Sequence, residues 1–174
     1  LESKPKKICL LKRNIIDFLL SKSKLASRLL RLDPRAAIAI DEKQIILSLK
    51  GYIYRVDITN GHQAIEHAFR KNMNNPLGFS KISDIEGFQD TIVYGEYWGN
   101  PQKEAVAIYG RNQFGTWKKL YEIHKETVCH IHNIIPDRYR NVVLILTGDS
   151  DQESGIWKAT NNFNEVVPLL VGKQ

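Results

Sequence analysis

Apolar residues follow a helical spacing at the start of the chain and a strand-like pattern afterwards. Over residues 8–20 they recur at intervals of three or four, with basic residues between them, which predicts a helix. Pro34 ends any such helix, because proline lacks an amide hydrogen and clashes with the preceding turn. Beyond Pro34 we expect short strands.

Six runs rich in β-branched and aromatic residues predict these strands. They span residues 45–47, 52–56, 91–94, 105–109, 142–146 and 166–170. Turn-forming pairs such as Asn60-Gly61 and Gly148-Asp149 separate the runs. After residue 31, only residues 63–71 suggest a further helical turn. The pattern is that of an all-β protein behind a short helical segment.

Three segments, residues 51–55, 107–111 and 155–159, resemble one another, which indicates a repeat. Their matching aromatic residues are Tyr54, Tyr109 and Trp157, separated by 55 and 48 residues. This period is close to that of four-stranded propeller blades. The last two units also share a strand that ends in glycine and an acid, Gly95-Glu96 and Gly148-Asp149. Chance likeness between amphipathic strands is the alternative.

We therefore predict an all-β fold, a partial β-propeller of about three four-stranded blades. Residues 1–31 would form a basic, partly helical head, and residues 32–174 the blades. A closed propeller contains about four to eight blades, so three leave an open arc. The exposed faces of its end blades would need further blades or a second chain to cover them. We expect the chain to be part of a larger protein.

The positive charge lies in the head. The 174 residues carry a net charge of +6, yet residues 1–31 hold nine basic residues against two acidic ones, and the remainder sixteen against seventeen. A basic head suits anionic lipid, nucleic acid or an acidic partner, although a solvated terminal segment is the simpler interpretation. Nucleic-acid binding is disfavoured, because the strand region has no basic surplus.

Several other classes are excluded or disfavoured by the sequence. No stretch approaches the roughly 20 apolar residues of a membrane helix, and no cleavable signal peptide is visible, so we expect a cytoplasmic protein. Cys9 and Cys129 are the only cysteines and are far apart, which excludes a disulfide framework. Phosphate-binding and nucleophile-elbow motifs are absent, and no cofactor is expected.

Blade topology would gather four candidate catalytic residues. If the strands of a blade alternate in direction, the start of its first strand and the end of its second lie together. This would bring together His130, His132 and Asp149 of the last blade with Glu96 of the preceding one. His130 and His132, two apart, would point to the same side.

The candidate cluster has three interpretations. Its carboxylates would suit general acid and base catalysis on a glycosidic bond. Alternatively, imidazoles favour a zinc-like ion, whereas the oxygens of Asp149, Asp151 and Glu153 favour calcium. The simplest interpretation is that all are polar structural groups. The sequence leaves the metal question open.

A nearby set of residues is predicted to bind ligand. Tyr97 and Trp98 offer apolar rings that stack on sugars, and Asn100 lies in the same loop. Asp151 and Glu153, in a loop over the candidate cluster, complete this predicted set.

Short motifs in the chain resemble a known superfamily. The turns at Gly110, Asn112, Phe114 and Trp117, and at Thr160, Asn162, Asn164 and Val167, resemble degraded copies of the Asp-box (BNR repeat) of sialidase-type β-propellers. In either copy the asparagine would hold its hairpin by hydrogen bonds to backbone amides.

An ordered set of segments is similar to a bacterial, glycosyl-hydrolase-like branch of the sialidase superfamily. The segments are 95–97, 100–101, 130–132 and 147–157, and the resemblance runs from about residue 29 to 174. It implies a carbohydrate-processing propeller, of which this chain would be an N-terminal portion. The arginine triad and Tyr-Glu pair of true sialidases have no counterparts that we can place here.

Three functions are compatible with these patterns. The first is a glycosidase-like domain, incomplete or inactive as an isolated chain, with a carbohydrate ligand. The second is a noncatalytic glycan-binding or protein-assembly propeller. The third is a scaffold that binds anionic membrane surfaces through its basic head.

Overall fold

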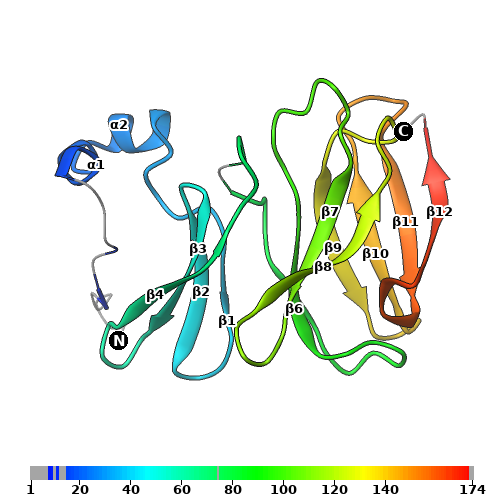
Figure 1. Cartoon of the computed structure of the whole chain (residues 1–174), viewed down its shortest axis with the longest axis horizontal. Coiled ribbons are helices and arrows are strands. Elements are labelled where there is room, and N and C mark those ends of the chain that lie inside the picture. Colours follow the sequence, from blue (N-terminus) through cyan, green and yellow to red (C-terminus); the bar gives the residue numbers. More distant parts are fainter. Residues whose placement is uncertain (1–7, 10, 12–14, 74, 173–174) are drawn as a thin grey trace, which may run out of the picture.

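The computed structural model describes residues 8, 9, 11, 15–73 and 75–172. This part of the chain is all-β, as predicted, apart from two short α-helices and one 3-10 turn. Its strands form three four-stranded antiparallel sheets, which follow one another from left to right in Figure 1. No helix in the described ranges has the length and apolar character needed to cross a membrane.

The elements follow the chain in a simple order. The helical elements are α1 (Ile15–Leu20), α2 (Lys24–Leu29) and η1 (Asn161–Phe163). The first sheet contains β1 (Ala37–Ala39), β2 (Gln44–Leu49), β3 (Tyr52–Asp57) and β4 (Gln63–Ala68). The second contains β5 (Ser80–Ile82), β6 (Thr91–Gly95), β7 (Val106–Arg111) and β8 (Trp117–Ile123). The third contains β9 (Ile131–Asp137), β10 (Val142–Thr147), β11 (Gly155–Thr160) and β12 (Glu165–Val171).

The three sheets share one topology and one irregularity. Each is a meander in which neighbouring strands are consecutive in sequence. In each, the pairing of the third with the fourth strand shifts register immediately before an aromatic residue: Tyr54, Tyr109 or Trp157. Such a β-bulge adds one residue to one strand and increases the local twist. The predicted equivalence of these three aromatic positions is confirmed in the register of the sheets.

Two helical predictions need correction. The helix expected over residues 8–20 begins only at Ile15, and Ile8, Cys9 and Leu11 are not helical; residues 10 and 12–14 lie outside the described residues. Cys9 and Leu11 instead pack against the first sheet. The turn suggested for residues 63–71 is wrong as well, because residues 63–68 are strand β4 and pair with β3. Tertiary pairing here outweighs local propensity.

One hydrophobic core runs through all three sheets. Fully buried aliphatic side chains come from each of them, such as Ile53 in β3, Ile108 in β7 and Ile145 in β10. We call the contact of the first with the second sheet the first seam, and that of the second with the third sheet the second seam. At the second seam Gly95 lies so close to Ile131 that an added Cβ would fall 2.6 Å from the Cβ atom of Ile131. The seams therefore fix where the strand ends lie relative to one another.

Candidate functional site

The paired histidines stand at the start of β9. His130 directly precedes this strand and His132 is its second residue, so the extended backbone directs both side chains to one side, as predicted. Their rings are stacked, with centroids 4.9 Å apart and planes 15° apart. His130 is buried, whereas His132 is 35% exposed at its side chain. The pair thus reaches from the interior to the surface.

Asp149 joins the two histidines from the neighbouring strand. It follows β10, whose last residue, Thr147, is paired with Ile131. Its Oδ2 atom lies 2.6 Å from Nε2 of His130, and its Oδ1 atom 3.1 Å from Nε2 of His132. We call these three residues the His–Asp cluster.

The backbone of Asp149 has a φ of 107°. Residues other than glycine rarely adopt this region, and it is stable only where the surroundings enforce it. The conformation directs a carboxylate toward the imidazoles.

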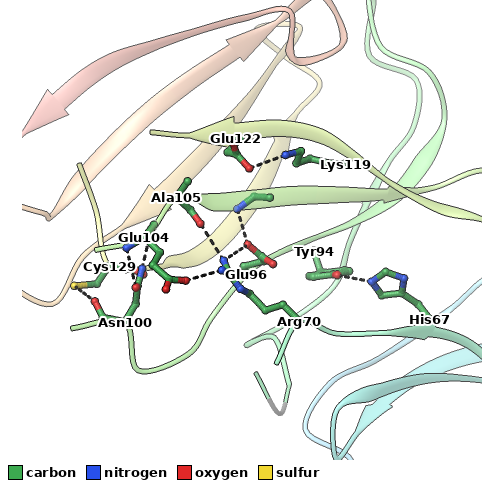
Figure 2. Close-up of polar contacts among 11 residues, drawn as sticks. His67, Arg70, Tyr94, Glu96, Asn100, Glu104, Ala105, Lys119, Glu122 and Cys129 are labelled. Carbon is green, nitrogen blue, oxygen red and sulfur yellow. Dashed lines mark hydrogen bonds and ion pairs between the residues drawn. The ribbon is translucent and has the colours of Figure 1, made fainter. Parts of the chain in front are cut away.

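Glu96 makes its polar contacts away from this cluster. It follows β6 and is buried, and its Oε2 atom accepts hydrogen bonds from the Ala107 amide at 2.9 Å and from Nη1 of Arg70 at 3.3 Å (Figure 2). Burial raises the pKa of the Glu96 carboxyl, and these two donors partly oppose the rise. The next residue, Tyr97, contacts the cluster instead, its ring centroid lying 4.4 Å from that of His130.

Trp98 contacts the cluster directly, and Asn100 contacts the residue before His130. The guanidinium of Arg70 covers the Trp98 ring at 4.1 Å, and the Trp98 carbonyl lies 3.3 Å from Nδ1 of His130. The side-chain amide of Asn100 donates to the carbonyl oxygens of Glu104 and Cys129, both at 2.9 Å (Figure 2). Asn100 therefore ties the loop after β6 to the residue before His130.

The two further acids of the predicted ligand set differ from each other. Asp151 is exposed. Glu153 is buried and forms an ion pair with Lys103, whose Nζ atom lies 2.6 Å from Oε1. The hydrogen bond from Lys103 lowers the pKa of the Glu153 carboxyl. Glu153 is thus bound to a lysine.

A hollow of about 300 Å³ opens beside the cluster, and we call it the rim hollow. Of the predicted residues, Tyr97, Trp98, His130 and Asp149 line it. Arg31, Arg35, Asn72 and Asn75 also line it and were not predicted from the sequence. These four residues come from the segments before β1 and after β4, and no spacing in the sequence connects them with the histidines.

The arginines of β3 and β7 lie elsewhere. Arg55 and Arg111 both form ion pairs with Glu66 at the first seam, Arg111 through two hydrogen bonds of 2.8 Å. They do not line the rim hollow.

Comparisons with known proteins give little further information. No family model matches the chain, and no curated protein matches it. A chain in the "Crystal structure of Nidogen/Laminin Complex" is similar at 16% sequence identity with a TM-score of 0.49. The similarity covers 78% of this chain and 46% of that one, so the chain spans less than half of the structure that it matches. A likeness of this degree identifies neither a family nor a function.

Proposed function

We propose that the three sheets are consecutive blades of a β-propeller and that the rim hollow binds a carbohydrate. The carbohydrate proposal rests on the rim hollow, where the Tyr97 ring lies beside hydrogen-bonding and cationic groups at one edge of the sheets. Sugars are recognised by such a combination, because their rings have apolar faces and polar edges.

The blade interpretation rests on repetition within the chain. Three meanders of four strands carry a bulge at the same position. The sialidase type is favoured by the turn after β7, where Oδ1 of Asn112 accepts hydrogen bonds from the amides of Phe114 and Thr116 at 3.0 and 2.9 Å. This is the role expected for the Asx residue of an Asp-box. Asn162 differs, because its Oδ1 atom accepts a hydrogen bond from the amide of Gln89, in the loop between β5 and β6.

Three blades would form an arc that requires partners. A propeller closes with about four to eight blades, so the outer sheets would need further blades or a second chain beside them. The last strand, β12, exposes Val167, Leu169 and Leu170, which is consistent with this proposal. Light scattering should show self-association of the isolated chain. A stable monomer with the sharp melting transition of a complete domain would contradict the arc.

Binding fits the rim hollow better than cleavage does. Most glycosidases use two carboxylic groups, one on either side of the glycosidic bond. Here the Glu96 carboxylate is bound to Arg70 and Ala107, and that of Asp149 faces two histidines. Arg31 and Arg35, in contrast, would attract the carboxylate of an acidic sugar.

Calorimetry with acidic and neutral oligosaccharides tests the proposal. We expect binding of oligomers of uronic acids, and Tyr97→Ala should weaken it at least about tenfold because a stacking surface is lost. Tyr139→Ala is the matched control, since this tyrosine is 91% exposed and lies in a different loop. Unchanged affinity of the Tyr97 variant, or no binding by the wild type, would overturn carbohydrate binding. Turnover of a glycoside that His132→Ala or Asp149→Ala abolishes would instead favour the hydrolase.

A second function is favoured by the surface of α1 and α2. These helices expose large apolar side chains, among them Ile15, Leu25 and Leu29 at 70–78%. Lys22, Lys24 and Arg28 lie among them in the sequence. Exposed apolar residues with basic neighbours suit the surface of an anionic membrane.

Vesicle sedimentation distinguishes this second function. The chain should bind vesicles that contain phosphatidylserine, and less so at high salt, whereas Ile15→Ser with Leu25→Ser should release it. Leu169→Ser removes a similarly exposed apolar residue from β12 and serves as the control. Equal binding by all three proteins would contradict a role of the helices.

A further inference from the structure

Two of the three possible ligand atoms in the His–Asp cluster, the Nε2 atoms of the histidines, have no hydrogen-bond partner. The Nε2 atoms of both histidines are buried, and neither forms a hydrogen bond. Each nevertheless lies close to an Asp149 oxygen, at 2.6 and 3.1 Å. In a structural histidine–aspartate pair the N–H group would point along the line to the oxygen. Neither contact has that geometry, so each nitrogen is near the carboxylate without donating to it.

The surroundings of His130 determine which of its nitrogens is free. Its Nδ1 atom lies 3.3 Å from the carbonyl oxygen of Trp98, which can only accept a hydrogen bond. Nδ1 is therefore the donating nitrogen, and in the neutral ring Nε2 is the nitrogen that keeps a lone pair for a ligand bond. Metal-binding histidines are commonly held in this way, by donating their other ring N–H to a carbonyl or carboxylate.

We propose that His130, His132 and Asp149 bind a divalent transition-metal ion of the zinc type. The proposal goes beyond carbohydrate binding and does not depend on it. The three donor atoms lie within 4.8 Å of one another. Ligands of one zinc ion at 2.0–2.2 Å lie about 3–4 Å apart. The Asp149 carboxylate must therefore move away from Nε2 of His130, which is now 2.6 Å from it, to admit the ion. The exposure of His132 and Asp149, 35% and 53% at the side chain, leaves room for this movement.

The donor set selects the kind of metal. Two imidazoles and one carboxylate suit zinc and other first-row transition metals, whereas calcium takes six to eight oxygens. Of the two further carboxylates considered for calcium, Glu153 is bound to Lys103 at 2.6 Å, and Asp151 is not in the group of donor atoms that lie within 4.8 Å of one another. A zinc-like ion is therefore favoured over calcium, the alternative left open by the sequence.

The site would be open on one side. Three protein ligands leave at least one position of a tetrahedral ion for water or an anion. His130 and Asp149 both line the rim hollow, so that position would be reached from it, close to Arg31 and Arg35. The ion and the two guanidinium groups would together favour a carboxylate or phosphate group.

Metal titration of the full chain tests the inference, with calorimetry for Zn²⁺ and visible absorption for Co²⁺. We expect one saturable site per chain, a Co²⁺ spectrum that Zn²⁺ removes, and no displacement by Ca²⁺. His132→Ala and Asp149→Asn should each weaken Zn²⁺ binding at least about tenfold, since even the loss of an outer partner of a ligand costs 10–100-fold. Circular dichroism would establish that each variant is folded.

Two controls carry the same chemical changes outside the site. His124→Ala removes an exposed imidazole, and Asp151→Asn an exposed carboxylate two residues from Asp149. Both should bind Zn²⁺ like the wild type. Absence of saturable binding, or binding that survives both His132→Ala and Asp149→Asn, would overturn the metal site. The carbohydrate proposal is tested separately, by oligosaccharide binding measured without metal.

Discussion

At the scale of single residues, the clearest case of a perturbed group is His67 at the first seam. Its Nε2 atom lies 2.8 Å from the Tyr94 hydroxyl, and its ring is within 6 Å of those of Tyr109 and Trp117. Burial in these surroundings lowers the pKa of His67 below its usual value of 6.5. The folded protein therefore keeps this histidine neutral over a range in which the unfolded chain is protonated.

This shift predicts a dependence of stability on pH. As the pH falls below about 6.5, the unfolded state takes up a proton at His67 before the folded state does, so the free energy of unfolding decreases. One such proton contributes up to about 1.4 kcal/mol per pH unit. In His67→Gln this contribution is absent, and urea unfolding between pH 7.5 and 5.5 should show a shallower decrease. An unchanged slope in the variant would contradict the assignment.

Part of the candidate site was predictable from the sequence at this scale. Strand alternation placed His130 and His132 on one side, and the antiparallel pairing brought Asp149 to them. Glu96 could not be excluded, because the side on which a residue projects after a strand ends depends on partners such as Arg70, which is distant in sequence. Arg31, Arg35, Asn72 and Asn75 of the rim hollow were missed for the same reason.

At the scale of elements, the second seam depends on the glycine at the end of β6, which has no side chain. Gly95 ends β6, and an added Cβ would lie 2.6 Å from the branched Cβ of Ile131 and closer still to its Cγ2 atom. The Cβ of Ile131 cannot move without the backbone of β9. The amide of Ile131 also donates to the carbonyl of Glu96 at 3.0 Å. Glycine at this position therefore allows the second and third sheets to approach.

Gly95→Ala should destabilise the protein by about 1–3 kcal/mol, the usual cost of overpacking a dense core. Gly99→Ala is the matched control, because its added Cβ would meet no atom within 4 Å, and we expect little change in stability. Both are measured by chemical unfolding. If Gly95→Ala were as stable as Gly99→Ala, the close approach of the sheets would be contradicted.

Six of the twelve strands in the described residues overlap with one of the six predicted runs, and β4 shows why a strand can escape prediction. Runs such as residues 142–146 are β-branched and bounded by turn residues, so local pattern and final structure agree. Strand β4 carries Glu66 and His67, which do not form an apolar run. It becomes a strand through pairing with β3 and through the partners of these two residues across the first seam.

At the scale of the whole molecule, the sheets are joined by polar contacts as well as by the core. Glu66 of β4 binds Arg55 within the first sheet and Arg111 of the second sheet, and the side chains of Glu66 and Arg111 are only 7% and 8% exposed. Removing one partner of a buried ion pair leaves an uncompensated charge. Glu66 therefore connects the first sheet to the second.

Glu66→Ala should lower the free energy of unfolding by about 3–5 kcal/mol. Glu122→Ala breaks the pair with Lys119, which is exposed at both side chains, and should cost about 1 kcal/mol or less (Figure 2). Thermal or urea unfolding measures both. Similar losses in the two variants would show that Glu66 contributes no more than a surface pair does.

The His–Asp cluster at the edge of the third sheet is the feature on which the proposed metal chemistry depends most. Crystals grown with zinc and measured at the zinc absorption edge test it directly. We predict one anomalous peak about 2.0–2.2 Å from Nε2 of His130, Nε2 of His132 and an oxygen of Asp149. A map with no peak between these atoms at saturating zinc would contradict the metal site.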